Sequence, residues 1–118
     1  MKSILTLLVS ALIAGPTFSQ PKINVQDAGK HIGENVTICS KVYGIKYIDR
    51  SGVTLINLGA AYPSSPLTLV IFGKDRNNFP KVPEKMYSDK QICVTGKIEE
   101  YKGKDEIIIS KPDEIVIN

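Results

Sequence analysis

The stretch from Lys90 to Ser110 constrains the fold of this chain most strongly, because it has the pattern of a β-hairpin. Apolar and polar residues alternate along its first half, as they do in a strand with one buried face. The apolar row consists of Ile92, Val94 and Ile98. Lys102-Gly103 then supplies a two-residue turn, since such a loop needs the positive φ that glycine tolerates. The run of isoleucines that follows completes the hairpin, and the pattern predicts a small antiparallel β domain.

Further strand segments precede and follow the hairpin. The sequence predicts strands at residues 34–48, 53–58 and 67–72, and a short strand or extended tail at residues 113–118. Gly44 interrupts the first of them, and a glycine within a strand often marks a bulge or a bend. A bend there lets the two halves of the strand pair with different neighbours. Between the third strand and the hairpin, residues 75–79 predict one helical turn that ends before Pro80.

The first nineteen residues differ in composition from the rest of the chain. An apolar run from Ile4 to Ala14 follows Lys2, and Gly15-Pro16 ends it. Spanning a membrane takes roughly twenty apolar residues, and this run is about half that length. The layout is that of a secretory signal peptide at residues 1–19, which predicts export to the periplasm or the exterior with no stable membrane insertion after cleavage. Residues 20–33 are then a lead-in to one domain at residues 34–118.

Composition bounds the class of partner only loosely. The 118 residues contain 15 Lys and Arg against 12 Asp and Glu, for a formal net charge of +3. A strongly basic nucleic-acid-binding domain carries a larger excess. Charge alone therefore favours no particular partner, and no motif in the chain implies a cofactor.

Cys39 and Cys93 are the two cysteines of the chain, and both fall on polar faces of predicted strands. Export would place them in an oxidising compartment. If the strands pair antiparallel with Cys39 opposite Cys93, Ile38 faces Val94 and every apolar position points to the core. We therefore predict a cross-strand disulfide that closes a loop of about 54 residues, worth on the order of 3–4 kcal/mol. Two cysteines and the distant His31 are too few ligands for a metal site.

The order of elements and several residue runs resemble a known fold family. The runs are Ser51 to Gly59, Tyr62-Pro63, Leu67 to Phe72 and Val94 to Ile98. They resemble small exported bacterial OB-fold domains of the nucleic-acid-binding class related to anticodon-binding OB domains. The resemblance covers about residues 28–117 and implies a five-stranded Greek-key barrel with a short helical turn between strands three and four. Its bent first strand would pair with both the second and the fourth, the pairing that the cysteines require.

The resemblance also implies a binding surface on the second and third strands, flanked by the loops at residues 48–52 and 101–104. Carried onto this chain, the nucleic-acid-binding candidates are Lys46, Tyr47, Arg50, Asn57, Tyr62, Lys102 and Lys104. The cations would neutralise phosphates and the tyrosines would offer stacking planes. Lys74 and Arg76 would extend a basic edge. Each of these residues, taken singly, is also typical of a solvated charge or of a tyrosine packed at the rim of a barrel.

These residues leave two functions open. The first is a non-catalytic module for single-stranded nucleic acid or nucleotides in an exported protein. The second is a periplasmic structural domain that uses the same barrel face for a protein or a glycan, because an OB-fold does not dictate its ligand.

The sequence favours no enzymatic activity. A metal-assisted nuclease needs clustered carboxylates near basic groups. The candidates for such a cluster are Asp49 beside Arg50 and the pair Glu99-Glu100. Neither candidate has a further carboxylate at a spacing typical of a metal site. We also find no nucleophile–base signature and no glycine-rich phosphate loop.

Overall fold

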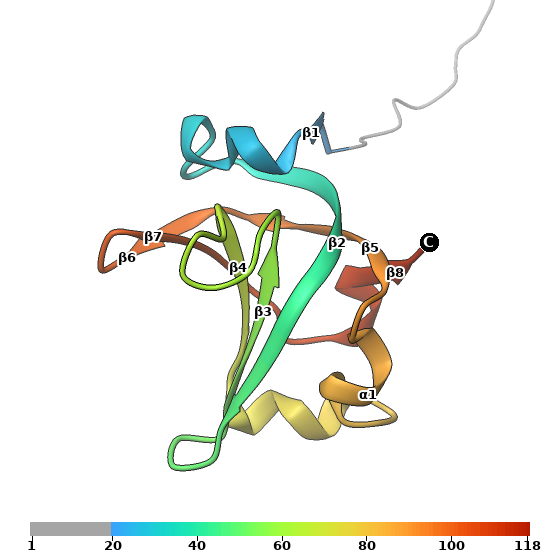
Figure 1. The fold of residues 1–118 in the computed structure, drawn as a ribbon. Helices are drawn as coiled ribbons and strands as arrows, with labels where there is room; N and C mark the ends of the chain where they lie inside the picture. The colour runs from blue at the N-terminus through green and yellow to red at the C-terminus, as the bar shows by residue number, and fades with distance from the viewer. Residues whose placement is uncertain (1–19) are drawn as a thin grey trace, which may run out of the picture.

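A computed structural model describes residues 20–118, and the predicted signal peptide lies outside the described residues. The described chain is mostly β-sheet with short helical turns (Figure 1). The strands are β1 (Lys22–Ile23), β2 (Asn35–Ile48), β3 (Val53–Leu58), β4 (Leu67–Ile71), β5 (Gln91–Lys97), β6 (Glu99–Tyr101), β7 (Lys104–Ile108) and β8 (Ile115–Ile117). The helical segments are the 3-10 helices η2 (Val25–Lys30), η3 (Gly73–Asn78) and η4 (Pro112–Glu114) and the α-helix α1 (Pro83–Tyr87).

The strands form one sheet in the order β6-β7-β4-β3-β2-β5-β8, and β1 adds to β2. The prediction of an all-β fold is confirmed, but the predicted five strands and the closed barrel are wrong. The sheet has eight strands, and its hydrogen-bonded ladder does not close. The additional strands are two or three residues long, and so short a segment gives no recognisable alternation. In the chain only Ile98 lies between β5 and β6. In the sheet, however, β6 is at one edge and β5 is near the other.

Strand β2 has two antiparallel partners, one for each half, as its central glycine predicts. Residues Asn35 to Lys41 pair antiparallel with β5, and Val42 to Ile48 pair antiparallel with β3. The register shifts between Val42 and Gly44, where the strand passes from one partner to the other. A bulge is the usual device for bending a strand at such a point.

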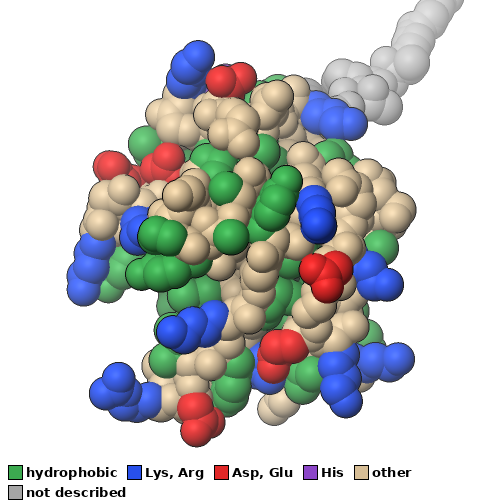
Figure 2. Space-filling view, viewed as in Figure 1, with side chains coloured by type: hydrophobic (Ala, Val, Ile, Leu, Met, Phe, Trp, Pro, Cys, Tyr) green, Lys and Arg blue, Asp and Glu red, His purple; other side chains and the backbone are tan. Residues whose placement is uncertain are grey.

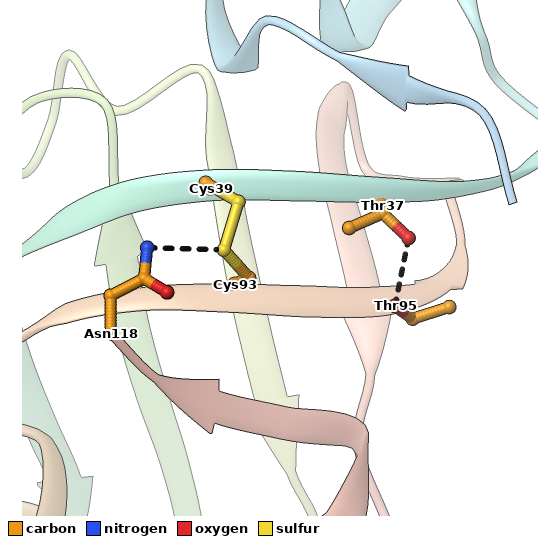
Figure 3. Close-up of a disulfide and its surroundings, with 5 residues drawn as sticks. All are labelled: Thr37, Cys39, Cys93, Thr95 and Asn118. Carbon is orange, nitrogen blue, oxygen red and sulfur yellow. Dashed lines mark hydrogen bonds between the residues drawn. A yellow bond between two sulfur atoms is a disulfide. The ribbon is translucent and has the colours of Figure 1, made fainter. Parts of the chain in front are cut away.

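The register between β2 and β5 confirms the predicted disulfide. Cys39 lies opposite Cys93, and their sulfur atoms are bonded (Figure 3). Both side chains lie on the outer face of the sheet and are half-buried. On the same face the hydroxyl groups of Thr37 and Thr95 form a hydrogen bond of 2.9 Å. The disulfide and this hydrogen bond therefore link β2 and β5 at neighbouring positions on one face.

The opposite face of each strand makes the core, as the alternation predicts. Five isoleucine and six leucine or valine side chains from five strands are completely buried there, among them Ile38, Ile56 and Ile107. Phe79 and Tyr87 pack edge to face at 6.3 Å between ring centres, and both belong to this core. Val25 and Ala28 of the lead-in are also buried, so η2 packs onto the domain.

The segment between β4 and β5 is helical, as predicted, and consists of two short helices instead of one turn. Pro83 occupies the first turn of α1, where its missing N–H costs nothing. In η3, Arg76 pairs with Glu84 of α1 at 2.8 Å and ties the two helices together. No helix among residues 20–118 has both the length and the apolar composition to cross a membrane.

Candidate ligand-binding groove

The outer face of β2, β3, β4 and β7 carries the side chains that the core does not use. Strand pairing brings Asn57 beside Thr68, and Thr68 beside Glu106, in one row across three strands. Gly44 pairs with Asn57 from the other side and extends this row onto β2. A neighbouring row runs through Lys46, Leu55, Val70 and Ile108. The two rows form the floor of a groove.

The polar end of the groove is a pocket of about 290 Å³. The β3–β4 loop supplies one wall and β7 supplies the other. Its lining residues are Lys46, Ile48, Leu55, Asn57, Tyr62, Ser65, Thr68, Lys104 and Glu106. A lysine therefore comes from each flank, one on β2 and one on β7.

Tyr62 stands at the mouth of this pocket, in the loop between β3 and β4. Its side chain is 72% exposed, so much of the ring is open to a ligand. The ammonium group of Lys104 lies 5.5 Å from the centre of the ring, on one of its faces. A cation and an aromatic ring so placed offer both charge and a stacking plane.

The apolar end of the groove is a second pocket of about 460 Å³ (Figure 2). It shares Ile48, Leu55 and Glu106 with the polar end. Its other lining residues are Val53, Val70, Phe72, Glu99, Glu100, Tyr101 and Ile108. Figure 2 shows hydrophobic side chains gathered over the middle of the viewed face, with charged groups around them. The groove is therefore continuous but divided into a polar, lysine-flanked end and an apolar, glutamate-flanked end.

Glu106 lies where the two ends meet. Partial burial raises the pKa of its carboxyl group, and the carboxylate of Glu99, its cross-strand partner, raises that pKa further. A like-charge pair directly opposite each other on two strands is unfavourable, and a ligand that donates a hydrogen bond or brings a cation would relieve it.

The structure brings four of the seven predicted site residues into one pocket, namely Lys46, Asn57, Tyr62 and Lys104. Tyr47 lies elsewhere, because successive residues of a strand point to opposite faces. Its ring packs against the guanidinium of Arg76 at 4.0 Å, and the hydrogen bond from Arg76 holds the pKa of Glu84 below its usual value. Tyr47 and Arg76 are thus parts of a packed ion-pair cluster.

The other two predicted residues lie in turns. Arg50 is exposed in the turn between β2 and β3, and Lys102 is exposed in the turn between β6 and β7. Neither lines a pocket of the groove. Lys102 instead lies over the ring of Tyr101, 5.3 Å from its centre.

Sequence reasoning missed several groove residues. Phe72 has the pattern of a core residue, yet it is 39% exposed and lines the apolar end. It directly follows β4 and is the N-cap residue of η3. Thr68 and Val70 occupy the alternate positions of the same strand, and this period of two is the signal that could have found them.

Among residues 20–118 no three His, Cys, Asp or Glu side chains come together in a way that could hold a metal ion. The chemistry that the groove offers is hydrogen bonding, cationic contacts and apolar or aromatic contact.

The strand order and the groove define the class of structure to which the chain is similar, an OB-like all-β fold. No protein-family profile matches the sequence, and no curated protein matches it either. Solved structures do match, at sequence identities that establish the fold alone.

One similar structure is an OBody bound to hen egg-white lysozyme, with a TM-score of 0.60 and 18% identity over 87% of this chain and 96% of that one. An aspartyl-tRNA synthetase from Leishmania major Friedlin matches with a TM-score of 0.52 and 13% identity, over 92% of this chain. The asparaginyl-tRNA synthetase of Entamoeba histolytica, solved with asparaginyl-adenylate, matches with a TM-score of 0.52 and 21% identity over 84% of this chain. The matches span 23% and 24% of the two synthetase chains.

Proposed function

We propose that this chain is a non-catalytic binding module for single-stranded nucleic acid or nucleotides, which bind along the outer face of β3, β4 and β7. The observation that carries the proposal is the pocket in which Lys46 and Lys104 flank Asn57 and Tyr62. Cations beside an exposed aromatic ring are the usual means of binding a strand of phosphates and bases. The similarity in fold to two tRNA synthetases is compatible with this class of ligand.

We further propose that the module acts outside the cytoplasm. The apolar segment at residues 4–14 and the disulfide between Cys39 and Cys93 support export, because disulfides persist in oxidising compartments. Binding in this proposal involves no covalent step, and the groove needs no cofactor.

The experiment is a titration of a labelled single-stranded oligonucleotide with the purified protein at several salt concentrations, followed by fluorescence anisotropy. We expect binding at low salt that weakens steeply as salt is added. Replacing Lys46 and Lys104 together by glutamine should weaken binding and reduce the slope of log K against log salt by about 1.4, or about 0.7 for each lost phosphate contact.

The matched control replaces Lys85 and Lys111 by glutamine. These residues lie on α1 and before η4, outside the groove lining, and the substitution removes the same charge. The control should keep most of the binding and the salt slope of the groove. Absence of binding to any oligonucleotide at low salt, or an equal loss in both double variants, would contradict the proposal.

A protein or glycan ligand is the second candidate, and the apolar end of the groove favours a protein. Phe72 and Ile108 are each 39% exposed there, and three glutamates surround them. Such a surface suits an apolar segment with adjacent Lys or Arg. The OBody of similar fold was solved bound to a protein. Binding of basic, apolar peptides that Phe72→Ser abolishes, without binding of oligonucleotides, would support this candidate over the first.

A further inference from the structure

The polar end of the groove contains a buried amide whose hydrogen-bonding capacity is half used. Asn57 is only 9% exposed, and its Oδ1 accepts hydrogen bonds from Ser65 Oγ at 3.3 Å and from Thr68 Oγ1 at 3.1 Å. In the structure both hydroxyls are taken up by Oδ1, so Nδ2 is the amide atom that is left to contact a ligand. Nδ2 has no acceptor among residues 20–118.

An unpaired donor in a buried position is unfavourable, because it loses its hydrogen bond to water and gains none in return. Native structures therefore satisfy most such groups with protein atoms or with water. Because Asn57 lines the pocket, a ligand that brings an acceptor oxygen can also satisfy Nδ2. The amide can therefore donate a hydrogen bond from Nδ2 to a ligand in the pocket.

Gly44 keeps the approach to this donor open. It pairs with Asn57 across β2 and β3, and a Cβ atom at position 44 would lie 3.9 Å from Asn57 Nδ2. Any other residue would place its side chain against the donor. Gly44 has no positive φ that would require glycine, so its lack of a side chain has its clearest consequence at Asn57 Nδ2.

We propose that the polar pocket is a subsite for one nucleobase that carries a carbonyl oxygen, which accepts a hydrogen bond from Asn57 Nδ2. The base would lie next to the open ring of Tyr62, and Glu106 would accept a hydrogen bond from an N–H group of the base. The flanking lysines would contact the adjoining phosphates. This inference rests on the proposed function and names which part of the ligand the groove recognises.

The size and the polarity of the pocket agree with this class of ligand. Its volume of about 290 Å³ lies at the lower end of small-molecule sites, so it suits one base with its sugar. The hydroxyls of Ser65 and Thr68 direct their hydrogens to Asn57, and toward a ligand they can only accept. The pocket therefore combines one donor with several acceptors. Adenine lacks a carbonyl oxygen, whereas guanine and cytosine carry one each and thymine and uracil carry two.

The test compares short oligodeoxythymidylate with oligodeoxyadenylate of equal length, at low salt, by anisotropy. The wild-type protein should bind the thymidylate about five- to tenfold more tightly, the effect of one hydrogen bond to a buried group. Competition by uridine monophosphate and adenosine monophosphate should show the same order. Equal or tighter binding of the adenylate would overturn the inference.

Two variants examine the donor itself. Gly44→Ala should cover Nδ2 with a methyl group and reduce thymidylate binding to the adenylate level, with no change of net charge. Asn57→Asp keeps the shape of the side chain and replaces the donor by an oxygen, so it should have at least as large an effect. Asn35→Asp is its matched control, because it adds the same charge at an exposed end of β2 that pairs with β5. Thermal unfolding should show that all three variants fold.

The outcomes separate this inference from the function on which it rests. If the wild type binds oligonucleotides and Gly44→Ala and Asn57→Asp leave base preference unchanged, the subsite is wrong and the binding module stands. If the wild type binds no oligonucleotide, both are wrong. If Gly44→Ala instead abolishes binding of a peptide, the pocket recognises a backbone carbonyl and the nucleobase is excluded.

Discussion

At the scale of single residues, backbone conformation explains the choice of residue at positions where the apolar pattern does not. Lys102 and Gly103 form the turn between β6 and β7 with φ values of 51° and 78°. Positive φ at both central residues is what a two-residue hairpin needs, and the sequence predicted this turn. The side chain of Lys102, in contrast, could not be placed from the sequence, because the turn fixes the backbone and leaves a long side chain free to lie over Tyr101.

Replacing Gly103 by alanine tests the turn. A Cβ at this position meets nothing within 4 Å, so the cost should come from the left-handed backbone alone. We expect the free energy of unfolding to fall by about 1–2 kcal/mol in urea titrations. Gly44→Ala is the control, since it adds the same methyl group without a positive φ and should be neutral or stabilising. An equal loss in the two variants would contradict this account of the turn.

The ion pair between Arg76 and Glu84 predicts a pH dependence. The hydrogen bond from Arg76 lowers the pKa of Glu84 in the folded state, so the pair stabilises the fold above the unfolded-state pKa, and this contribution is lost as pH falls through the lowered pKa. Glu84→Gln should reduce stability at neutral pH by less than about 1 kcal/mol, because the carboxylate is partly exposed.

Thermal unfolding measured across acidic and neutral pH checks this prediction. The wild type and Glu84→Gln should converge at low pH, where both side chains are uncharged. Glu100→Gln, at an exposed position, should leave the curve unchanged. A difference between the wild type and Glu84→Gln that grows as the pH falls would be the opposite of what the lowered pKa requires.

At the scale of elements, the long alternating strands could be predicted and the short ones could not. The bend of β2, its two partners and its register with β5 follow from the placement of Gly44 and of the cysteines. Strands β1 and β6 have two and three residues, too few to show a period. Their existence depends on which neighbour lies within hydrogen-bonding distance, and that is a tertiary property.

The packing of β5 against β7 provides the prediction at this scale. A Cβ at Gly96 would lie 2.6 Å from Cγ2 of Ile107, closer than two carbon atoms can approach. Gly96→Ala should therefore lower stability by about 1–3 kcal/mol through overpacking. Adding Ile107→Ala, which removes the clashing methyl group, should cost less than the sum of the two single changes, as a double-mutant cycle would show. Strict additivity would mean that the two strands do not meet here.

At the scale of the whole molecule, a disulfide and a shared core hold together a sheet that does not close on itself. The bond between Cys39 and Cys93 spans 54 residues of sequence, including β3, β4 and both helices between them and β5. Of the seven residues that the sequence proposed for the site, four meet in one pocket. The other three do not line this pocket. Strand parity and the packing of Arg76 decide where Tyr47 points, whereas Arg50 and Lys102 lie in turns, where a long side chain is free to move.

Replacing both cysteines by serine tests the contribution of the disulfide. The chain-entropy estimate for this loop is about 3–4 kcal/mol, and the loss should appear as a lower midpoint in urea. The wild type under reducing conditions should lose a similar amount, while the double variant should not respond to reductant. A wild type that is as stable reduced as oxidised would show that the core alone determines the fold.

The proposed ligand-binding surface is the outer face of β3, β4 and β7. The most direct test is to map the backbone amide chemical shifts of the isotope-labelled protein while a single-stranded oligonucleotide is added. We expect saturable shifts concentrated at the groove, including Asn57, Tyr62, Thr68 and Lys104, with the amides around Cys39 and Cys93 unchanged. Shifts confined to the face of β5 and β8, or no shifts at low salt, would contradict it.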